Sequence, residues 1–196
     1  MIIKEAELVI SAADKKQWPE ETYPEIVMVG KSNVGKSSLI NAICNRKKLA
    51  YVGNTPGKTR LINFFLINQS LMLVDVPGYG FAKINKAHFV KFGQMMEDYF
   101  NLREQKKCMV MLVDARHKPT NEDVEMLEFA RYYCLKTIVV ATKMDKLKNS
   151  EIKKNLNLIK ETLNLEAETL IRFSSEKKQG IDELWEEILK SCNIDE

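Results

Sequence analysis

Residues 30–37 constrain the fold of this chain more than any other part of its sequence. They read Gly-Lys-Ser-Asn-Val-Gly-Lys-Ser and match the pattern GxxxxGK[ST]. An apolar run at residues 26–29 precedes them and a helical pattern begins at Lys36, which is the strand–loop–helix context that this pattern requires. Such a loop can surround phosphate oxygens with its backbone N–H groups at the positive end of a helix. An ordinary glycine turn is the alternative, but the flanking elements favour a loop that binds a nucleoside triphosphate.

Apolar runs alternate with helical patterns along the whole chain, which is typical of βαβ units. The predicted strands lie at residues 26–29, 64–67, 71–74, 109–113, 137–141 and 169–173, with a further edge strand at 6–11. Only residues 68–70 separate the second run from the third, which is too short for a crossover, so these strands should form an antiparallel hairpin. The sequence therefore predicts an α/β fold, a doubly wound, mostly parallel sheet with one antiparallel hairpin strand.

The predicted helices begin at Lys36, near Lys86, at Asn121, at Ser150 and at Ile181. Asn121 and Ser150 are expected to be N-caps, because each precedes an acidic residue that favours the first helical turn. No linker or repeat interrupts the pattern. We assign residues 25–191 to one domain, residues 1–24 to an N-terminal extension that packs on it, and residues 192–196 to a tail.

The composition is that of a globular protein with a sizeable core. Of the 196 residues, 45% are hydrophobic and 29% are charged, which excludes collagen-like, low-complexity and wholly disordered chains. The longest apolar run, residues 108–113, is far shorter than the ~20 residues of a membrane-spanning helix. Lys4, Glu5 and Glu7 interrupt the N-terminal apolar stretch, and the four cysteines lack metal-binding spacing. We expect a cytoplasmic protein with reduced thiols and no membrane span.

Basic residues concentrate near the front of the chain. Residues 31–60 contain seven lysines and arginines and no acidic residue, although the net charge of the whole chain is only +3. This segment is expected to face an anionic ligand or partner. Six of the eight glycines fall within residues 30–80, which indicates several loops of special backbone conformation at one edge of the fold.

A second motif follows the predicted strand at residues 71–74. Residues 75–78 read Asp-Val-Pro-Gly, a DxxG pattern that alone would be a plain Pro-Gly turn. Beside a phosphate loop, Asp75 is expected to hold Mg²⁺, directly or through water, and Gly78 to donate its N–H to the γ-phosphate. Within the loop, Lys36 should bridge the β- and γ-phosphates, and the Ser37 hydroxyl should bind Mg²⁺.

The third motif, residues 142–145, reads Thr-Lys-Met-Asp and approximates the NKxD motif of guanine-nucleotide proteins. Asp145 can accept hydrogen bonds from the ring N–H and the exocyclic amine of guanine, an edge that adenine does not present. Lys143 would lie along the base, while Thr142 stands where an asparagine is usual. Capping of a helix by Asp145 is the alternative interpretation.

Ser174 and Ser175 follow the predicted strand at residues 169–173. Related proteins place a turn here whose backbone donates to the guanine carbonyl, and a plain polar turn is the alternative. Four motifs in this order, each after a predicted strand, indicate a guanine-nucleotide-binding protein.

From about Glu25 to Leu189 the chain resembles the EngB (YihA/YsxC) family of bacterial GTPases, within the Era/TrmE-like group. The segments that carry this resemblance are Ser32-Asn33-Val34-Gly35-Lys36-Ser37-Ser38, Thr55-Pro56-Gly57-Lys58-Thr59, Asp75-Val76-Pro77-Gly78-Tyr79-Gly80-Phe81-Ala82-Lys83 and Thr142-Lys143-Met144-Asp145-Lys146. The resemblance implies action in large ribosomal subunit assembly, with a link to cell division and septation. The implied partner is a precursor of that subunit, its rRNA and ribosomal proteins, and the chain is expected to be a monomer off the ribosome.

The resemblance also implies roles for three further residues. Thr59 matches the switch I threonine that binds Mg²⁺ when the γ-phosphate is present. Asn33 matches a loop asparagine that marks potassium-stimulated relatives, so the expected ions are Mg²⁺ and K⁺. Tyr79 stands where many small GTPases carry a catalytic glutamine. Because a phenol cannot orient water as a carboxamide does, the intrinsic rate of GTP hydrolysis should be low.

The residues expected to act in catalysis are Lys36, Thr59, Gly78 and Asn33, and those expected to hold the metal are Ser37, Thr59 and Asp75. The residues expected to bind GTP are Gly30, Lys31, Ser32, Asn33, Val34, Gly35, Lys36, Ser37, Ser38, Gly57, Lys58, Thr59, Arg60, Leu61, Asp75, Val76, Pro77, Gly78, Thr142, Lys143, Met144, Asp145, Phe173, Ser174 and Ser175.

Two other functions fit parts of the sequence. A GTP-dependent scaffold without significant turnover would carry the same motifs. A P-loop kinase for a small molecule would share the phosphate loop, but the Thr-Lys-Met-Asp motif and the lack of an obvious lid domain disfavour it.

Overall fold

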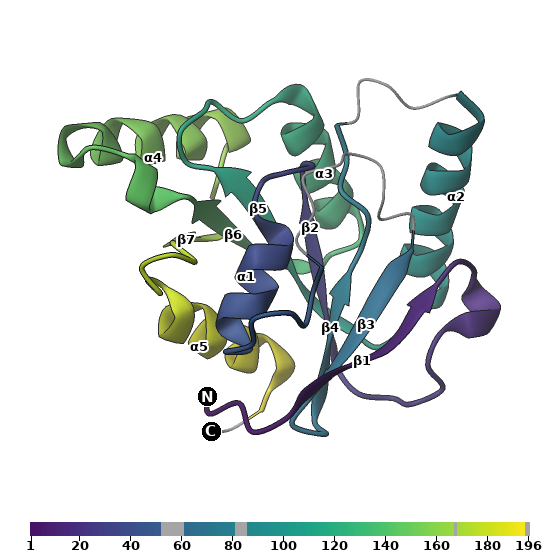
Figure 1. Ribbon diagram of the computed structural model, residues 1–196. Helices are drawn as coiled ribbons and strands as arrows, with labels where there is room; N and C mark the ends of the chain where they lie inside the picture. The colour runs from purple at the N-terminus through teal and green to yellow at the C-terminus, as the bar shows by residue number, and fades with distance from the viewer. Residues whose placement is uncertain (52–60, 81–85, 167, 195–196) are drawn as a thin grey trace.

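The structure is a computed structural model that describes residues 1–51, 61–80, 86–166 and 168–194, with only the backbone described for residues 86–92. Its described strands form one sheet in the order β1-β3-β4-β2-β5-β6-β7. Helices cover both faces of this sheet (Figure 1). The strands are β1 Ala6–Ala12, β2 Glu25–Gly30, β3 Ile62–Ile67, β4 Leu71–Asp75, β5 Lys106–Asp114, β6 Lys136–Thr142 and β7 Thr169–Arg172.

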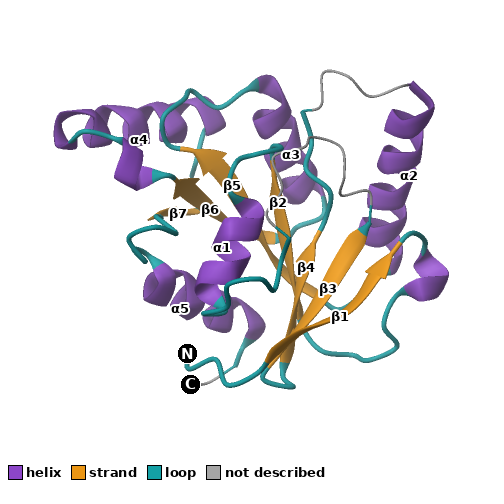
Figure 2. Cartoon of the chain, viewed as in Figure 1, coloured by secondary structure: helices purple, strands orange, loops and turns teal. Residues whose placement is uncertain are grey.

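Five α-helices and two short 3-10 helices are described. They are α1 Lys36–Ile43, α2 Lys86–Leu102, α3 Asn121–Tyr132, α4 Asn149–Leu163 and α5 Ile181–Cys192, with η1 Lys15–Gln17 and η2 Met144–Lys146. Two separate apolar cores result, one on each face of the sheet. Side chains of α2, α3 and α4 pack into one core, and those of α1 and α5 into the other. Figure 2 shows the same layers by secondary structure.

The predicted fold class is confirmed. Strand β3 runs antiparallel to both of its neighbours, β1 and β4, and every other strand pair is parallel. The turn that joins β3 to β4 contains Asn68 and Gln69 at positive φ, of 48° and 52°. The central strand β2 is buried along its whole length, as expected for a strand covered by helices on both faces.

The N-terminal residues contribute to the same sheet. Strand β1 pairs with β3 from Ala6, opposite Ile67, to Ala12, opposite Ile62. Its pairing shifts register between Leu8 and Ile10, which is typical of a bulged edge strand.

A buried ion pair anchors the chain between β1 and β2. The fully buried Glu25 carboxylate accepts hydrogen bonds from Tyr99 and from Arg103, each 2.7 Å long. Arg103 also donates to the carbonyl oxygens of Pro19 and Glu21. This network fixes residues 19–25 to the C-terminal end of α2.

Two predicted helix caps are wrong. Thr120, not Asn121, is the N-cap of α3, because the Asp123 carboxylate accepts from the Thr120 N–H and draws Asn121 into the helix. Helix α4 begins at Asn149 rather than after Ser150, with Lys148 at the cap position. In both helices an acidic side chain at the third helical position binds back to the cap backbone.

In the described part of the chain, we find no helix that is both long and apolar enough to span a membrane. The carboxyl ends of β2, β4, β5, β6 and β7 meet at one edge of the sheet, where the described motif segments begin. Ligands of open α/β sheets bind at this edge.

Candidate nucleotide-binding site

The phosphate loop joins β2 to α1. Its glycine Gly35 caps α1 with a φ of 109°, and Asn33 also has a positive φ of 63°. A Cβ at Gly30 would lie 2.8 Å from the Cγ1 atom of Val34 and 3.1 Å from the carbonyl oxygen of Leu112, so only glycine fits there. These backbone positions lead the chain from β2 into the N-terminus of α1, a place where backbone N–H groups can bind an anion.

Lys36 and Asp75 meet in the structure. The Lys36 ammonium donates to the Asp75 carboxylate and, at 2.6 Å, to the carbonyl oxygen of Val76. The side chains of Lys36 and Asp75 are 10% and 5% exposed, so water screens this pair weakly. The phosphate-loop lysine and the last residue of β4 are therefore in direct contact.

The DxxG segment runs directly along the phosphate loop. The Tyr79 N–H donates to the Gly30 carbonyl at 3.3 Å, and the Ser32 N–H donates to the Tyr79 carbonyl at 3.0 Å. Between them, a Cβ at Gly78 would lie 3.1 Å from both the Gly30 oxygen and the Ser32 nitrogen. A glycine at position 78 allows the two backbones to approach this closely.

The Tyr79 side chain is buried and turned to α3. Its hydroxyl donates to the Asp123 Oδ1 atom at 2.8 Å. Burial, followed by the neighbouring charge of Asp123, raises the pKa of Tyr79 well above its usual range. The phenol therefore stays neutral and donates its hydrogen bond to Asp123.

The predicted base-recognition motif contacts the phosphate loop. Thr142 donates through its hydroxyl to the Val34 carbonyl at 2.8 Å, and Lys143 donates to the Asn33 carbonyl at 2.8 Å. Lys143 has a φ of 60°, which directs its side chain from the end of β6 toward the loop. Thr142 makes its contact with a hydroxyl where the usual motif has an amide.

Asp145 lies beside the turn that follows β7. Its Oδ1 atom accepts from the Ser174 hydroxyl at 2.6 Å, while Lys146 contacts the other oxygen at 3.1 Å. The hydrogen bond from Ser174 is the largest cause of a lowered pKa of Asp145. The Phe173 carbonyl accepts from the Met144 N–H at 3.2 Å, so the two base-site segments are joined through their backbone.

Asp114, at the end of β5, is a site residue that the sequence analysis missed. Its carboxylate accepts from Lys143 at 2.9 Å and from two nitrogens of Arg116. Partial burial opposes ionisation, but the hydrogen bonds from Arg116 and Lys143 outweigh it and hold the pKa of Asp114 well below its usual range. An aspartate after a buried strand was the available signal, the same one that marked Asp75.

The structure brings the described members of the predicted site together at one sheet edge. Of the residues not yet placed, Lys31, Ser37 and Ser38 lie in the loop and the first turn of α1, Val76 and Pro77 are buried after β4, Leu61 precedes β3, and Ser175 follows Ser174. Gly57, Lys58, Thr59 and Arg60 lie outside the residues that the structure describes.

The available donors fit Mg²⁺ rather than a softer metal. Among the described residues no group of three or more His, Cys, Asp or Glu side chains could hold a metal ion. Ser37 and Asp75 offer a hydroxyl and a carboxylate, and Mg²⁺ is commonly held by one or two such oxygens together with substrate phosphates. These two residues would hold the ion, which supplies positive charge to the phosphate oxygens.

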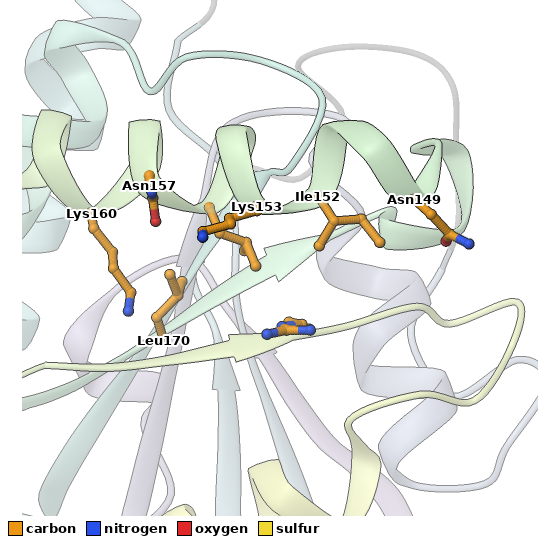
Figure 3. Close-up of a pocket in the computed structure, with 8 residues that line it drawn as sticks. Asn149, Ile152, Lys153, Asn157, Lys160 and Leu170 are labelled. Atoms are coloured by element: carbon orange, nitrogen blue, oxygen red, sulfur yellow. The ribbon is translucent and has the colours of Figure 1, made fainter.

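A separate groove of about 550 Å³ lies between α4 and β7. Figure 3 shows Lys153, Lys160 and Leu170 at its walls. No residue of the predicted nucleotide site lines this groove, although its residue Arg172 directly precedes Phe173. The predicted nucleotide site therefore lies among the loops at the sheet edge and apart from this groove.

The chain is similar over nearly its whole length to known GTP-binding proteins. A family model described as "50S ribosome-binding GTPase" matches residues 25–143. The probable GTP-binding protein EngB of Clostridium acetobutylicum is 54% identical over 197 residues, which cover 100% of this chain and 98% of the relative. The corresponding protein of Bacillus subtilis is 48% identical, with 98% and 100% covered.

Solved structures agree on the fold. A crystal structure of a probable GTP-binding protein EngB has a TM-score of 0.73 at 25% identity, covering 86% of this chain and 98% of that one. Aquifex aeolicus Era bound to GDP·AlF4⁻ has a TM-score of 0.71 at 23% identity, covering 88% of this chain and 57% of Era. The fold, the order of the motifs and the level of identity lead to one conclusion: the chain belongs to the EngB family of GTP-binding proteins.

Proposed function

We propose that this protein is a slow GTPase whose nucleotide state controls its docking on a precursor of the large ribosomal subunit. The observation that supports the proposal is the close contact of Gly78 with the phosphate loop. A Cβ atom added at Gly78 would lie 3.1 Å from the Gly30 oxygen and 3.1 Å from the Ser32 nitrogen. A DxxG glycine in this place can donate its N–H to a γ-phosphate that the loop holds. GTP and GDP then differ in whether a phosphate contacts Gly78.

Each part of the nucleotide has its own group of residues. The loop N–H groups and Lys36 bind the phosphates, and Lys36 gains a phosphate partner in addition to Asp75. Lys143 lies along the base, and the ionised Asp145 accepts from the guanine edge, held by Ser174. Adenine does not present the ring N–H and exocyclic amine that guanine offers to Asp145, which accounts for guanine selectivity.

The metal site is proposed to be formed by Ser37, Asp75 and Thr59. Ser37 is the second residue of α1, next to Lys36, and Asp75 is the last residue of β4. Asp75 also contacts Lys36, so it suits a water-mediated contact to the ion. Thr59 enters only through the family resemblance. Chelation of Mg²⁺ should therefore abolish GTP hydrolysis, whereas the affinity for GDP should only decrease.

Slow hydrolysis of GTP is expected from the hydrogen bond that Tyr79 makes with Asp123. Its hydroxyl donates to Asp123, so it does not orient an attacking water. Catalysis rests instead on Lys36, Gly78, Asn33, Thr59 and the metal, and unassisted sites of this kind turn over at about 10⁻⁴–10⁻³ s⁻¹.

The ribosomal partner is supported by the description of the matching family model, which names 50S ribosome binding. The exposed Lys47 and Lys48 follow α1 and, with the basic residues 58 and 60, offer positive charge to rRNA phosphates. A cytoplasmic monomer off the ribosome fits this role. The proposed link to cell division and septation rests on the family resemblance alone.

The deciding experiment measures phosphate release from GTP and from ATP by the purified chain, with and without large ribosomal subunits. We expect slow release from GTP alone, stimulation by the subunits and GTP-dependent co-sedimentation with them. Co-sedimentation without turnover would favour the scaffold. Transfer of phosphate to a small acceptor rather than to water would favour the kinase.

A further inference from the structure

We propose that Asp123, at the start of α3, is a positioning residue of the GTPase site: through Tyr79 it holds Gly78 against the phosphate loop. The inference rests on the proposed function and adds to it. It predicts that α3 responds to the nucleotide, although α3 carries none of the nucleotide-binding motifs.

The first observation is the backbone pairing of Tyr79. Lys31 and Tyr79 form an isolated parallel bridge, outside the named strands. Because Tyr79 bonds to both Gly30 and Ser32, its position fixes that of Gly78, its immediate neighbour. A shift of residue 79 by a fraction of an ångström would change the contact of Gly78 with the loop.

The second observation is that both members of this bridge reach α3 through their side chains. The Lys31 ammonium donates to the Thr120 hydroxyl at 3.2 Å, and Tyr79 donates to Asp123 at 2.8 Å. The Thr120 hydroxyl and N–H donate in turn to the Asp123 Oδ2 atom, at 2.9 and 2.8 Å. Lys31, Thr120, Asp123 and Tyr79 thus form a closed set of contacts, which we call the Tyr79 circuit.

The third observation is the burial of the two residues that form the Tyr79–Asp123 bond. Asp123 is 5% exposed and Tyr79 is 8% exposed. A buried carboxylate is costly unless donors satisfy it, and here the donors come from Thr120 and from Tyr79. Loss of the phenol leaves one carboxylate oxygen of Asp123 without this donor. The bond therefore resists any displacement of Tyr79.

Gly80 completes the geometry. It has a φ of 81°, and a Cβ there would lie 2.5 Å from the Lys31 Cε atom. The positive φ favours glycine here, and a larger residue would displace the Lys31 side chain on its way to Thr120. The residue after Tyr79 therefore serves the circuit as well.

These contacts have a functional consequence. If Gly78 moves toward a γ-phosphate, Tyr79 must move with it, and the first turn of α3 must follow or lose the bond to Tyr79. GTP and GDP should then produce different states of the start of α3. Reciprocally, a change at Asp123 should alter affinity for GTP more than for GDP, because only GTP uses Gly78.

The test compares Tyr79→Phe, Asp123→Ala and the double variant with the wild-type chain, by titration with fluorescent GDP and a non-hydrolysable GTP analogue in Mg²⁺. Tyr133→Phe is the matched control, because its hydroxyl donates at 2.8 Å to the exposed Asn101, away from the site. We expect each single variant to lower the affinity for the GTP analogue about three- to tenfold, with the affinity for GDP nearly unchanged. The double variant should bind the analogue no more weakly than Asp123→Ala alone, because Asp123→Ala already removes the bond that Tyr79→Phe removes.

A second readout is amide hydrogen exchange of the first turn of α3 in the GDP and GTP-analogue complexes. We expect a difference between the two complexes in the wild type and its loss in Tyr79→Phe. Equal weakening of both nucleotides, additive effects, or identical exchange in the two wild-type complexes would overturn the role of Asp123. A wild-type chain that neither binds nor hydrolyses GTP would instead overturn the proposed function.

Discussion

The Lys36 ammonium contacts the Asp75 carboxylate across the phosphate loop, in a pair that is almost completely buried. The two residues belong to different motifs, one for phosphate and one for metal. Their contact makes Lys36 and Asp75 mutually dependent, since removal of either charge leaves the other buried without its partner.

The first prediction concerns this pair. Lys36→Met should abolish GTP binding and lower the free energy of unfolding of the nucleotide-free chain by about 3–5 kcal/mol, because Asp75 keeps an unpaired buried charge. Urea unfolding measures the second effect. The control is Lys153→Met, which removes an exposed lysine of α4. Equal stability of Lys36→Met and the wild type would contradict the importance of the pair.

The second prediction concerns base recognition. Asp145→Asn should weaken the binding free energy of GTP by about 1–3 kcal/mol. The variant should instead favour xanthosine triphosphate, whose exocyclic oxygen needs a donor. Ser174→Ala should have a smaller effect in the same direction for GTP and no preference for xanthosine, because it removes only the 2.6 Å bond that orients Asp145. Titration with both nucleotides decides. Equal affinity of the wild type for ATP and GTP would refute guanine selectivity.

The third prediction concerns the pH dependence of stability. The pKa of Asp114 in the folded protein lies below its ordinary value of 3.8, so its ionic contacts are fully stabilising above about that pH and are lost as the pH falls through the folded-state pKa. Asp114→Asn should therefore lower the free energy of unfolding by about 1–3 kcal/mol near neutral pH. The difference from wild type should shrink only below pH 3.8.

Denaturant unfolding over a pH series measures this effect. Glu125→Gln, which removes an exposed carboxylate of α3, is the control and should change stability little at any pH. A constant difference between Asp114→Asn and the wild type across the whole acidic range would show that ionisation of Asp114 is not the cause.

The fourth prediction concerns the monovalent cation. GTP hydrolysis should be faster in potassium than in sodium at equal ionic strength, because a bound cation supplies positive charge that the site lacks. Asn33→Ala should remove the difference. The control is Asn45→Ala, since Asn45 shares an exposed position and a positive φ, 49° against 63° at Asn33. The same cation response in Asn33→Ala and the wild type would disprove a role of Asn33.

The sequence was sufficient for features that depend on neighbouring residues. The phosphate loop needs Gly30 and Gly35 at fixed positions between a strand and a helix, and both glycines occupy constrained backbone positions. Strands buried on both faces appear as short apolar runs, so their positions along the chain were predictable. The helix caps were less predictable than the strands. A side chain at the third helical position, Asp123 or Glu151, determined where each helix begins.

The tertiary structure alone decided which polar side chains meet. Lys36 and Asp75 are 39 residues apart in the chain, Tyr79 and Asp123 are 44 apart, and Asp114 and Lys143 are 29 apart. No local pattern relates these residues, because each side chain finds its partner only when parallel strands bring their carboxyl ends to one edge. The sequence thus determined the loops that can bind a nucleotide, whereas strand order and register determined the charges and hydrogen bonds that position them.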